Sequence, residues 1–312
     1  MLKFELQALQ RMLPELDRQS VDPVLASVWR RFYQIDYGYT HSDLDCRLGM
    51  AQVGDYRIAM QICRPVAPVA TLLVLHGYYD HMGLYGNVFQ WALEQGFAVL
   101  SCDLPGHGLS TGPRASINSF QEYQVVLQAM LAKALQLGLP KPWHILGQST
   151  GAAIALDYLL TQQPISELGQ TILLAPLVRP RAWQQSKFLY QLIKPFRSSI
   201  PRRYSDNTSD QKFIEFVRQQ DPLQARILPT AWVGALAQWI HYIEQRQPSR
   251  HSPIIVQGEA DMTVDWQYNL EVLTDKFYQP KILRLPQARH HLVNERPSVR
   301  DSMFMFLSKE LT

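Results

Sequence analysis

A serine flanked by glycines lies near the middle of the chain, in the segment GQSTG (147–151). The apolar segment WHIL, typical of a strand, precedes it, and a run of small and apolar residues typical of a helix follows it. A sharp strand-to-helix turn of this kind holds its central serine in a strained conformation, needs glycine on both sides and exposes the hydroxyl. Ser149 is therefore the predicted nucleophile.

A serine hydroxyl becomes nucleophilic when a histidine takes its proton and an acidic residue orients that histidine, here in the chain order Ser, Asp, His. Asp261 follows the apolar segment PIIVQG (253–258), and His290 follows KILRLP (281–286). Both residues lie just past the carboxyl end of an expected strand, where open α/β sheets gather their active sites. We predict a catalytic triad of Ser149, Asp261 and His290.

Three neighbouring residues compete for these roles. Glu259 and Asp265 are alternative acids, but Glu259 lies very close to the strand and Asp265 stands where the N-cap of the next helix is expected. His291 is the alternative base, and because an apolar pair follows it directly, packing or exposure to solvent is its expected role. The sequence favours Asp261 as the acid and His290 as the base.

The tetrahedral intermediate of acyl transfer needs backbone N–H donors directed at its oxyanion. One is expected from Thr150, the residue after the nucleophile. The second is expected from Tyr78, in the loop after the apolar segment TLLVL, where Gly77 allows the backbone to approach closely.

Three histidines near this loop suggest a second interpretation, as metal ligands. His76, His81 and His107 lie in the chain near Asp80 and Asp103. Each is placed in a turn, where a structural hydrogen bond is the more common role, and no Cys/His cluster has the spacing of zinc ligands. We expect neither a metal nor an organic cofactor.

The elements that must position these residues are short apolar segments alternating with helical patterns. A hairpin with arms at 44–50 and 56–63, preceded by a mostly helical lead-in (2–36), opens the pattern. The apolar segments predict strands buried on both faces, at 71–77, 97–106, 143–149, 171–176, 253–258 and 281–286. The helical patterns lie at 84–95, 118–137, 150–161, 265–277 and 297–309. The sequence predicts an α/β fold, with a mostly parallel central sheet flanked by helices.

One connection, of about 76 residues, is too long for this alternation. We expect an N-terminal helical extension (1–40), a core of two segments (41–176 and 251–312), and a helical insertion (177–250) that forms a lid over the carboxyl ends of the strands. The insertion holds 12 Lys/Arg against 5 Asp/Glu, a net charge of +7, and an aromatic stripe. A basic, aromatic cover suits an anionic amphiphile or a membrane surface. A lid whose aromatic residues form its own core explains the pattern equally well.

The composition is typical of a folded protein with a small net charge. Of 312 residues, 46% are hydrophobic, which excludes disordered and fibrous classes, and a net charge of +3 gives no argument for nucleic acid. Three widely spaced cysteines indicate a reducing compartment, and there is neither a secretory signal nor an apolar run of about 20 residues. We expect a cytoplasmic protein, with peripheral contact at the inner face of the membrane as an option for the basic insertion.

Four segments carry a resemblance to a known family: HGYYDHMGLYG (76–86), DLPGHGLSTGPR (103–114), GQSTG (147–151) and ARHHLVNE (288–295). Over about residues 42–308 the chain resembles the α/β-hydrolase superfamily, in its group of monoacylglycerol lipases and bacterial lysophospholipases, which shares its pattern with serine aminopeptidase-like hydrolases. The resemblance places the oxyanion loop at Tyr78, the nucleophile at Ser149, the acid at Asp261 and the base at His290. His291 stands where the group commonly has glutamate. The segment QQDPLQAR (219–226) is similar to the lid of bacterial lysophospholipases.

The resemblance implies a serine hydrolase that cleaves carboxylic esters of single-chain lipids, of lysophospholipase or monoacylglycerol lipase type, through an acyl-enzyme. Serine aminopeptidase-like or small-ester carboxylesterase activity is the alternative. A fold that binds a ligand without turnover is disfavoured by the intact triad. A dehalogenase or epoxide hydrolase is disfavoured because the nucleophile there would be aspartate.

Overall fold

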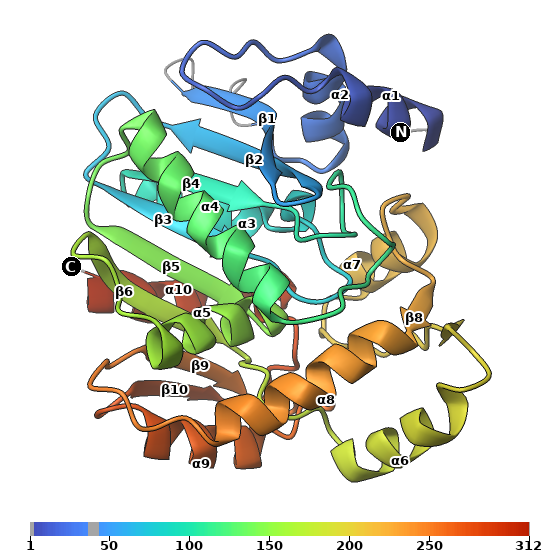
Figure 1. Ribbon diagram of the computed structural model, residues 1–312. Coiled ribbons are helices and arrows are strands. Elements are labelled where there is room, and N and C mark those ends of the chain that lie inside the picture. The colour runs from blue at the N-terminus through green and yellow to red at the C-terminus, as the bar shows by residue number, and fades with distance from the viewer. Residues whose placement is uncertain (1–2, 37–43, 312) are drawn as a thin grey trace.

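The computed structural model describes residues 3–36 and 44–311, and its centre is an eight-stranded sheet (Figure 1). The strand order is β1-β2-β4-β3-β5-β6-β9-β10, with β1 antiparallel to β2, β2 antiparallel to β4, and the other neighbours parallel. The bounds are β1 Asp45–Val53, β2 Tyr56–Arg64, β3 Ala70–Leu75, β4 Phe97–Cys102, β5 Trp143–Gln148, β6 Leu168–Leu174, β9 Ile254–Gly258 and β10 Lys281–Leu285. The predicted fold class is confirmed.

The central strands are buried along their length because helices cover both faces of the sheet. Every residue of β3, β4, β5 and β9 is buried. The expectation was wrong for β10, in which Ile282 is 38% exposed and no residue is fully buried. This strand lies at the edge of the sheet, where only β9 pairs with it.

The helices of the core form a layer on each face of the sheet (Figure 1). Helices α4 (Gln121–Leu137), α5 (Thr150–Thr161) and α9 (Trp266–Lys276) contribute to one apolar cluster, and α3 (Gly86–Glu94) and α10 (Pro297–Leu311) contribute to the other. Two 3₁₀ turns, η2 (Met82–Leu84) and η4 (Leu292–Asn294), lie in the loops after β3 and β10. All five helices predicted in the core are present within a few residues of their expected bounds.

The N-terminal segment packs onto the sheet through α1 (Lys3–Met12) and α2 (Val24–Phe32). Trp29, Leu9 and Ile35 are fully buried in the same apolar cluster as Leu48 and Met50 of β1. The stretch between the two helices forms a short bridge to β1, in which the Leu16 amide donates to the Met50 carbonyl at 2.8 Å. The boundary expected at residue 40 lies outside the described residues.

The cysteines differ from the expectation. Cys46 and Cys63 form a disulfide, and Cys102 is a buried free thiol. The two bonded residues lie directly opposite each other in the β1–β2 hairpin, which brings their side chains within reach. The cysteine count therefore gives no support for a reducing compartment.

The insertion, residues 177–250, is helical as expected and also contains a small two-stranded sheet. Its elements are α6 Trp183–Ile193, β7 Ser199–Pro201, α7 Gln211–Glu215, the π-helix η3 Phe216–Gln220, β8 Ile227–Pro229 and α8 Thr230–Glu244. The aromatic stripe lies on α8 and packs against the core: Trp232 Nε1 donates to Tyr123 Oη of α4, and Trp239 Nε1 donates to Asp157 of α5. Helix α6 instead exposes Phe188 at 68%.

We expect Trp29→Ala to lower the free energy of unfolding of the whole protein by about 3–5 kcal/mol, because it leaves a cavity in a shared core. Val24→Ala is the control on the same helix, since Val24 is 81% exposed and its truncation should change stability by less than about 0.5 kcal/mol. Urea unfolding monitored by circular dichroism measures both. A main transition of Trp29→Ala at the wild-type midpoint would mean that the N-terminal helices unfold independently of the sheet.

Candidate active site

Ser149 lies in the turn between β5 and α5, with φ of 55° and ψ of −109°. Such a conformation is costly for a residue with a side chain and persists only where the surroundings enforce it. A Cβ atom at Gly151 would lie 2.1 Å from the Leu75 carbonyl oxygen, and one at Gly147 would lie 2.3 Å from the Gly151 backbone. The two glycines are therefore required by close backbone contact on either side of the serine.

The structure brings the three predicted triad residues together. His290 Nε2 lies 2.9 Å from Ser149 Oγ, and His290 Nδ1 lies 2.7 Å from Asp261 Oδ2. The backbone behind His290 is held as well, because the Gln148 amide group donates to the His290 carbonyl at 2.8 Å. All three side chains are buried, with Ser149 only 8% exposed.

Asp261 is surrounded by groups that favour its charged form. Burial alone would raise its pKa, but the adjacent His290 and the N–H donors of Thr263 and Val264 outweigh burial and lower the pKa below its usual range. The side-chain amide of Gln257 adds a hydrogen bond at 3.2 Å. The carboxylate therefore stays ionised at neutral pH and can hold the imidazole in one orientation.

The rival residues face elsewhere. Glu259 pairs with Arg284 at 2.6 Å, and Asp265 lies at the N-cap of α9, with its carbonyl accepting from the Asn269 amide. His291 is buried, and its Nε2 lies 3.0 Å from an oxygen of Asp80. In the described part of the chain, none of these three side chains has a hydrogen bond or an ion pair with Ser149.

The loop after β3 carries the second expected oxyanion donor. Gly77 packs close to Ser149, since a Cβ atom there would lie 3.5 Å from Ser149 Cβ. The loop is fixed by Tyr85, whose hydroxyl accepts from the Gly77 amide at 2.9 Å and donates to Asp80 at 3.1 Å. The amides of Tyr78 and Thr150 have no acceptor within residues 3–36 and 44–311, so both remain available to a bound oxyanion.

The histidines considered as metal ligands are engaged in structural contacts. His76 Nε2 accepts from the Leu104 amide at 2.8 Å, and His107 Nδ1 lies 2.9 Å from the Pro105 carbonyl. Asp103 accepts from the backbone amides of Met82 and Leu109. Over the described residues, no three His, Cys, Asp or Glu side chains are grouped so that they could hold a metal ion.

A cavity of about 500 Å³ opens above Ser149 and His290. The core contributes its floor, with Tyr78, Thr150 and His291, and the insertion contributes most of the remaining wall. Most of the wall is apolar, and its apolar side chains from the insertion are Leu177, Pro180, Leu189, Ile193, Ile200, Pro201, Phe213, Ile214, Val217, Leu228, Trp232 and Val233. A long, apolar substituent therefore has a place next to the nucleophile.

Sequence reasoning did not identify Asp221, which is buried where the N-terminal segment, the loop after β3 and the insertion meet. Its carboxylate accepts from Tyr33 Oη at 2.7 Å, lies 3.0 Å from His81 Nε2 and accepts from Gln224 at 2.7 Å. Burial opposes both charges, but their mutual attraction and hydrogen bonds prevail, lowering the pKa of Asp221 and raising that of His81. The Asp-Pro-Leu step at 221–223 was the only signal for it.

Comparison with known protein families shows to which family the chain belongs. The family described as "Serine aminopeptidase, S33" matches residues 66–297. This range covers most of the chain and includes all three predicted triad residues, so the chain belongs to this family of α/β-hydrolases, and the resemblance drawn from the four sequence segments is confirmed.

Individual relatives agree with this assignment. The chain is 26% identical to "Monoglyceride lipase" of Homo sapiens over 76% of its own length and 80% of that protein. It is 34% identical to "Phospholipase YtpA" of Bacillus subtilis (strain 168) over 31% of its own length, a match that spans only 36% of that relative. A solved monoglyceride lipase from Saccharomyces cerevisiae, 17% identical, superimposes with a TM-score of 0.72 over 85% of this chain and 94% of that one, and shows the same fold.

The choice of acid can be tested by a matched pair of variants. We expect Asp261→Asn to lower kcat for a p-nitrophenyl ester about 10⁴-fold, since a neutral amide favours the wrong imidazole tautomer, while the fold persists because the new carbonyl can still accept from Thr263 and Val264. Glu259→Gln removes the rival charge, whose ion pair lies away from Ser149, and should leave kcat unchanged. Stopped assays at pH 7 measure kcat of both variants. A larger loss of kcat in Glu259→Gln than in Asp261→Asn would assign the role of the acid to Glu259.

Proposed function

We propose that the protein is a serine hydrolase that cleaves carboxylic esters of single-chain lipids, of lysophospholipase or monoacylglycerol lipase type, through an acyl-enzyme. The observation that carries the proposal is the continuous chain from Ser149 Oγ through His290 to Asp261, at 2.9 and 2.7 Å, on the floor of an apolar cavity. Two unpaired amides beside it supply donors for the charge that develops in acyl transfer.

The mechanism follows from the positions of these groups. Ser149 Oγ attacks the ester carbonyl while His290 Nε2 takes the hydroxyl proton, and the Tyr78 and Thr150 amides donate to the oxyanion. The tetrahedral intermediate collapses, the C–O bond to the alcohol breaks, and His290 gives its proton to the leaving alkoxide. Water then attacks the acyl-enzyme with His290 as general base, and the acid leaves as Ser149 is restored. Asp261 stabilises the imidazolium of His290 during both acylation and deacylation.

The cavity and the relatives support a lipid ester as the substrate. The apolar wall can accommodate an acyl chain, and the 500 Å³ volume falls in the range of sites for a single small ligand. The monoglyceride lipase and phospholipase names of the relatives point to the same class. The insertion, which walls the cavity, would then act as a lid over the substrate.

The experiment is hydrolysis by wild type and Ser149→Ala of a panel: a lysophospholipid, a monoacylglycerol, p-nitrophenyl esters of two chain lengths and an aminoacyl p-nitroanilide. We expect turnover of the lipid esters and a loss on the order of 10⁶-fold in Ser149→Ala. Unchanged circular dichroism of the variant is the control for folding.

The panel also separates the alternatives. Preference for the anilide would replace the proposal by aminopeptidase-like activity, and preference for short esters would replace it by a small-ester carboxylesterase. If no substrate is turned over and a fluorophosphonate does not label Ser149, the proposal of enzymatic activity is overturned. A ligand-binding protein is then the remaining alternative.

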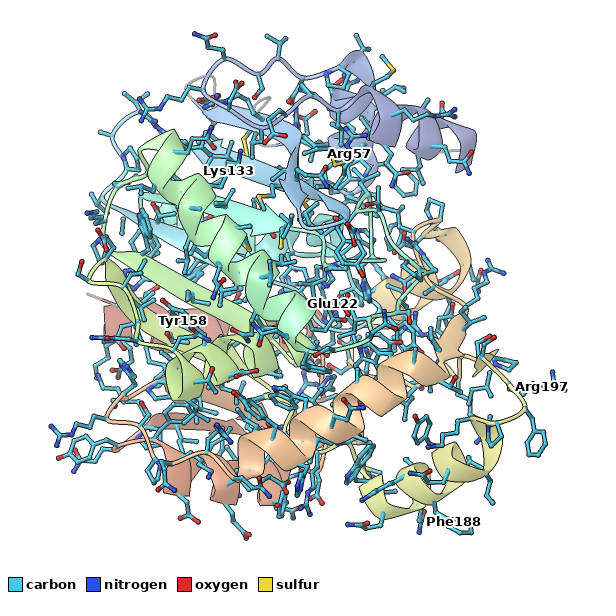
Figure 2. All side chains as sticks on the ribbon, in the orientation of Figure 1. Arg57, Glu122, Lys133, Tyr158, Phe188 and Arg197 are labelled. Atoms are coloured by element: carbon cyan, nitrogen blue, oxygen red, sulfur yellow. A yellow bond between two sulfur atoms is a disulfide. The ribbon has the colours of Figure 1, made fainter. Side chains whose placement is uncertain are left out.

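Peripheral contact of the insertion with an anionic membrane is a second part of the proposal. No helix among the described residues is long and apolar enough to cross a membrane. However, α6 exposes Phe188 at 68%, and the turn after it exposes Phe196 at 83%. Figure 2 shows Phe188 on the outer side of α6. Lys187, Lys194 and Arg197 lie in the same segment. Exposed aromatic side chains next to cations are typical of a surface that lies on lipid headgroups. A cytoplasmic location stays a prediction.

We expect the double substitution Phe188→Ser and Phe196→Ser to lower binding to phosphatidylglycerol vesicles at least 10-fold in sedimentation assays, since the apolar contact with the bilayer is lost. Val125→Ser, on the exposed side of α4 at 41% exposure, is the control and should bind as wild type does. Hydrolysis of a monomeric ester should stay unchanged in all three proteins. Equal binding of the double variant and the control would exclude α6 as the membrane contact.

A further inference from the structure

Arg202 is a half-buried cation in the wall of the cavity that contains Ser149. It directly follows β7, and its amide donates to the carbonyl of Arg226, the residue before β8, at 3.0 Å. Its guanidinium lies over the rings of Tyr79, at 3.9 Å, and Tyr204, at 4.4 Å. The side chain is thus held in place at the cavity rather than free in solvent.

The polar partners of Arg202 are neutral. Its Nη1 donates to Gln224 Oε1 at 2.6 Å and to the Ala225 carbonyl at 3.2 Å. Within residues 3–36 and 44–311, no carboxylate oxygen lies at ion-pairing distance from it. Burial lowers the pKa of Arg202, and the weaker influence of Tyr204, Tyr79 and Asp80 opposes this shift. Burial removes water from this cation, and no carboxylate of the described residues compensates for the lost hydration.

The other charges of the cavity wall are already paired or exposed. Asp80 has His291 at 3.0 Å, and Arg218 has Asp206 at 2.6 Å. Arg203 is exposed. Arg202 is therefore the charge in the wall best placed to receive an anion, and its planar fork suits two oxygens of a phosphate.

The position of Arg202 in the cavity indicates which part of the substrate would carry the bound anion. Arg202 stacks on Tyr79, the residue after the expected oxyanion donor Tyr78, whose ring centroid lies 4.1 Å from that of Tyr79. A group bound at Arg202 therefore lies in the same cavity as Ser149, and most of the wall of that cavity is apolar. We infer that Arg202 binds the phosphate of the alcohol part of the substrate, so that the enzyme selects lysophospholipids with an anionic headgroup over monoacylglycerols.

This inference rests on the proposed ester hydrolysis and adds the part of the substrate that is recognised. The sharpest comparison uses two monomeric substrates that differ only by a phosphate: 1-octanoyl-glycerol-3-phosphate and 1-octanoylglycerol. The proteins are wild type, Arg202→Gln, Arg202→Lys and Arg197→Gln. Arg197→Gln is the matched control, because it removes the same charge from the same insertion. Arg197 is exposed, as Figure 2 shows, and it is not among the residues that line the cavity.

We expect wild type to prefer the phosphate ester in kcat/KM, and Arg202→Gln to lose about 10- to 100-fold of this preference, as for a lost hydrogen bond to a charged group. The kcat/KM for 1-octanoylglycerol should fall far less than that for the phosphate ester, because the glycerol ester has no anion for Arg202 to bind. Arg202→Lys should keep part of the preference, because it retains the charge but not the fork. Arg197→Gln should behave as wild type. Equal losses on both substrates in Arg202→Gln, or equal changes in Arg202→Gln and Arg197→Gln, would overturn the inference.

A binding measurement separates this inference from the proposed function. Calorimetry of Ser149→Ala, with and without Arg202→Gln, uses the ether analogues 1-O-octyl-glycerol-3-phosphate and 1-O-octylglycerol, which need no turnover. Tighter binding of the phosphate analogue that is lost with Arg202 supports the subsite even if the esters are not hydrolysed. Hydrolysis without any such difference in binding overturns the subsite and leaves the ester hydrolase intact. Inorganic phosphate that binds as tightly as the phosphate analogue would assign Arg202 to free phosphate instead of a headgroup.

Discussion

The contact between the Ser149 turn and the end of β3 is the constraint on which the site depends. Because Gly151 lies against the Leu75 carbonyl, with no room for a Cβ atom, the turn that exposes the serine is fixed to the strand that leads into the Tyr78 loop. The proposed nucleophile and the proposed second oxyanion donor are therefore both anchored to the end of β3. Preorganisation of this kind lets backbone amides stabilise developing charge without reorganising during the reaction.

The insertion is attached to the catalytic loops at two places, so the wall of the cavity and the chemistry below it are mechanically connected. Asp221 joins it to His81 in the loop after β3. The Asn207 carbonyl accepts from the His291 amide at 2.7 Å, next to the base. A buried pair such as Asp221 and His81 is stable only when both partners are present and hydrogen-bonded. Movement of the insertion would therefore displace both the loop after β3 and the loop after β10.

The same network extends to the N-terminal segment. Tyr33 donates to Asp221, and its ring packs edge-on against His81 at 4.8 Å. The N-terminal helices thus support the loop after β3 from one side while the core strands support it from the other. Arg202 belongs to this arrangement as well, because Gln224, which accepts from Arg202, donates to Asp221. The proposed headgroup subsite is held by the residues that anchor the insertion.

The sequence by itself determined the α/β alternation and the places of Ser149, Asp261 and His290, because strand and turn signals are local and parallel strands bring their carboxyl ends to one edge. It did not determine that β10 is exposed, that Cys46 faces Cys63, or that the α8 stripe packs on the core while α6 exposes Phe188. Each of these depends on which element lies next to which. Asp221 and Arg202 became recognisable only in the tertiary structure, since burial and the presence or absence of a partner for a charge are properties of residues far apart in the chain.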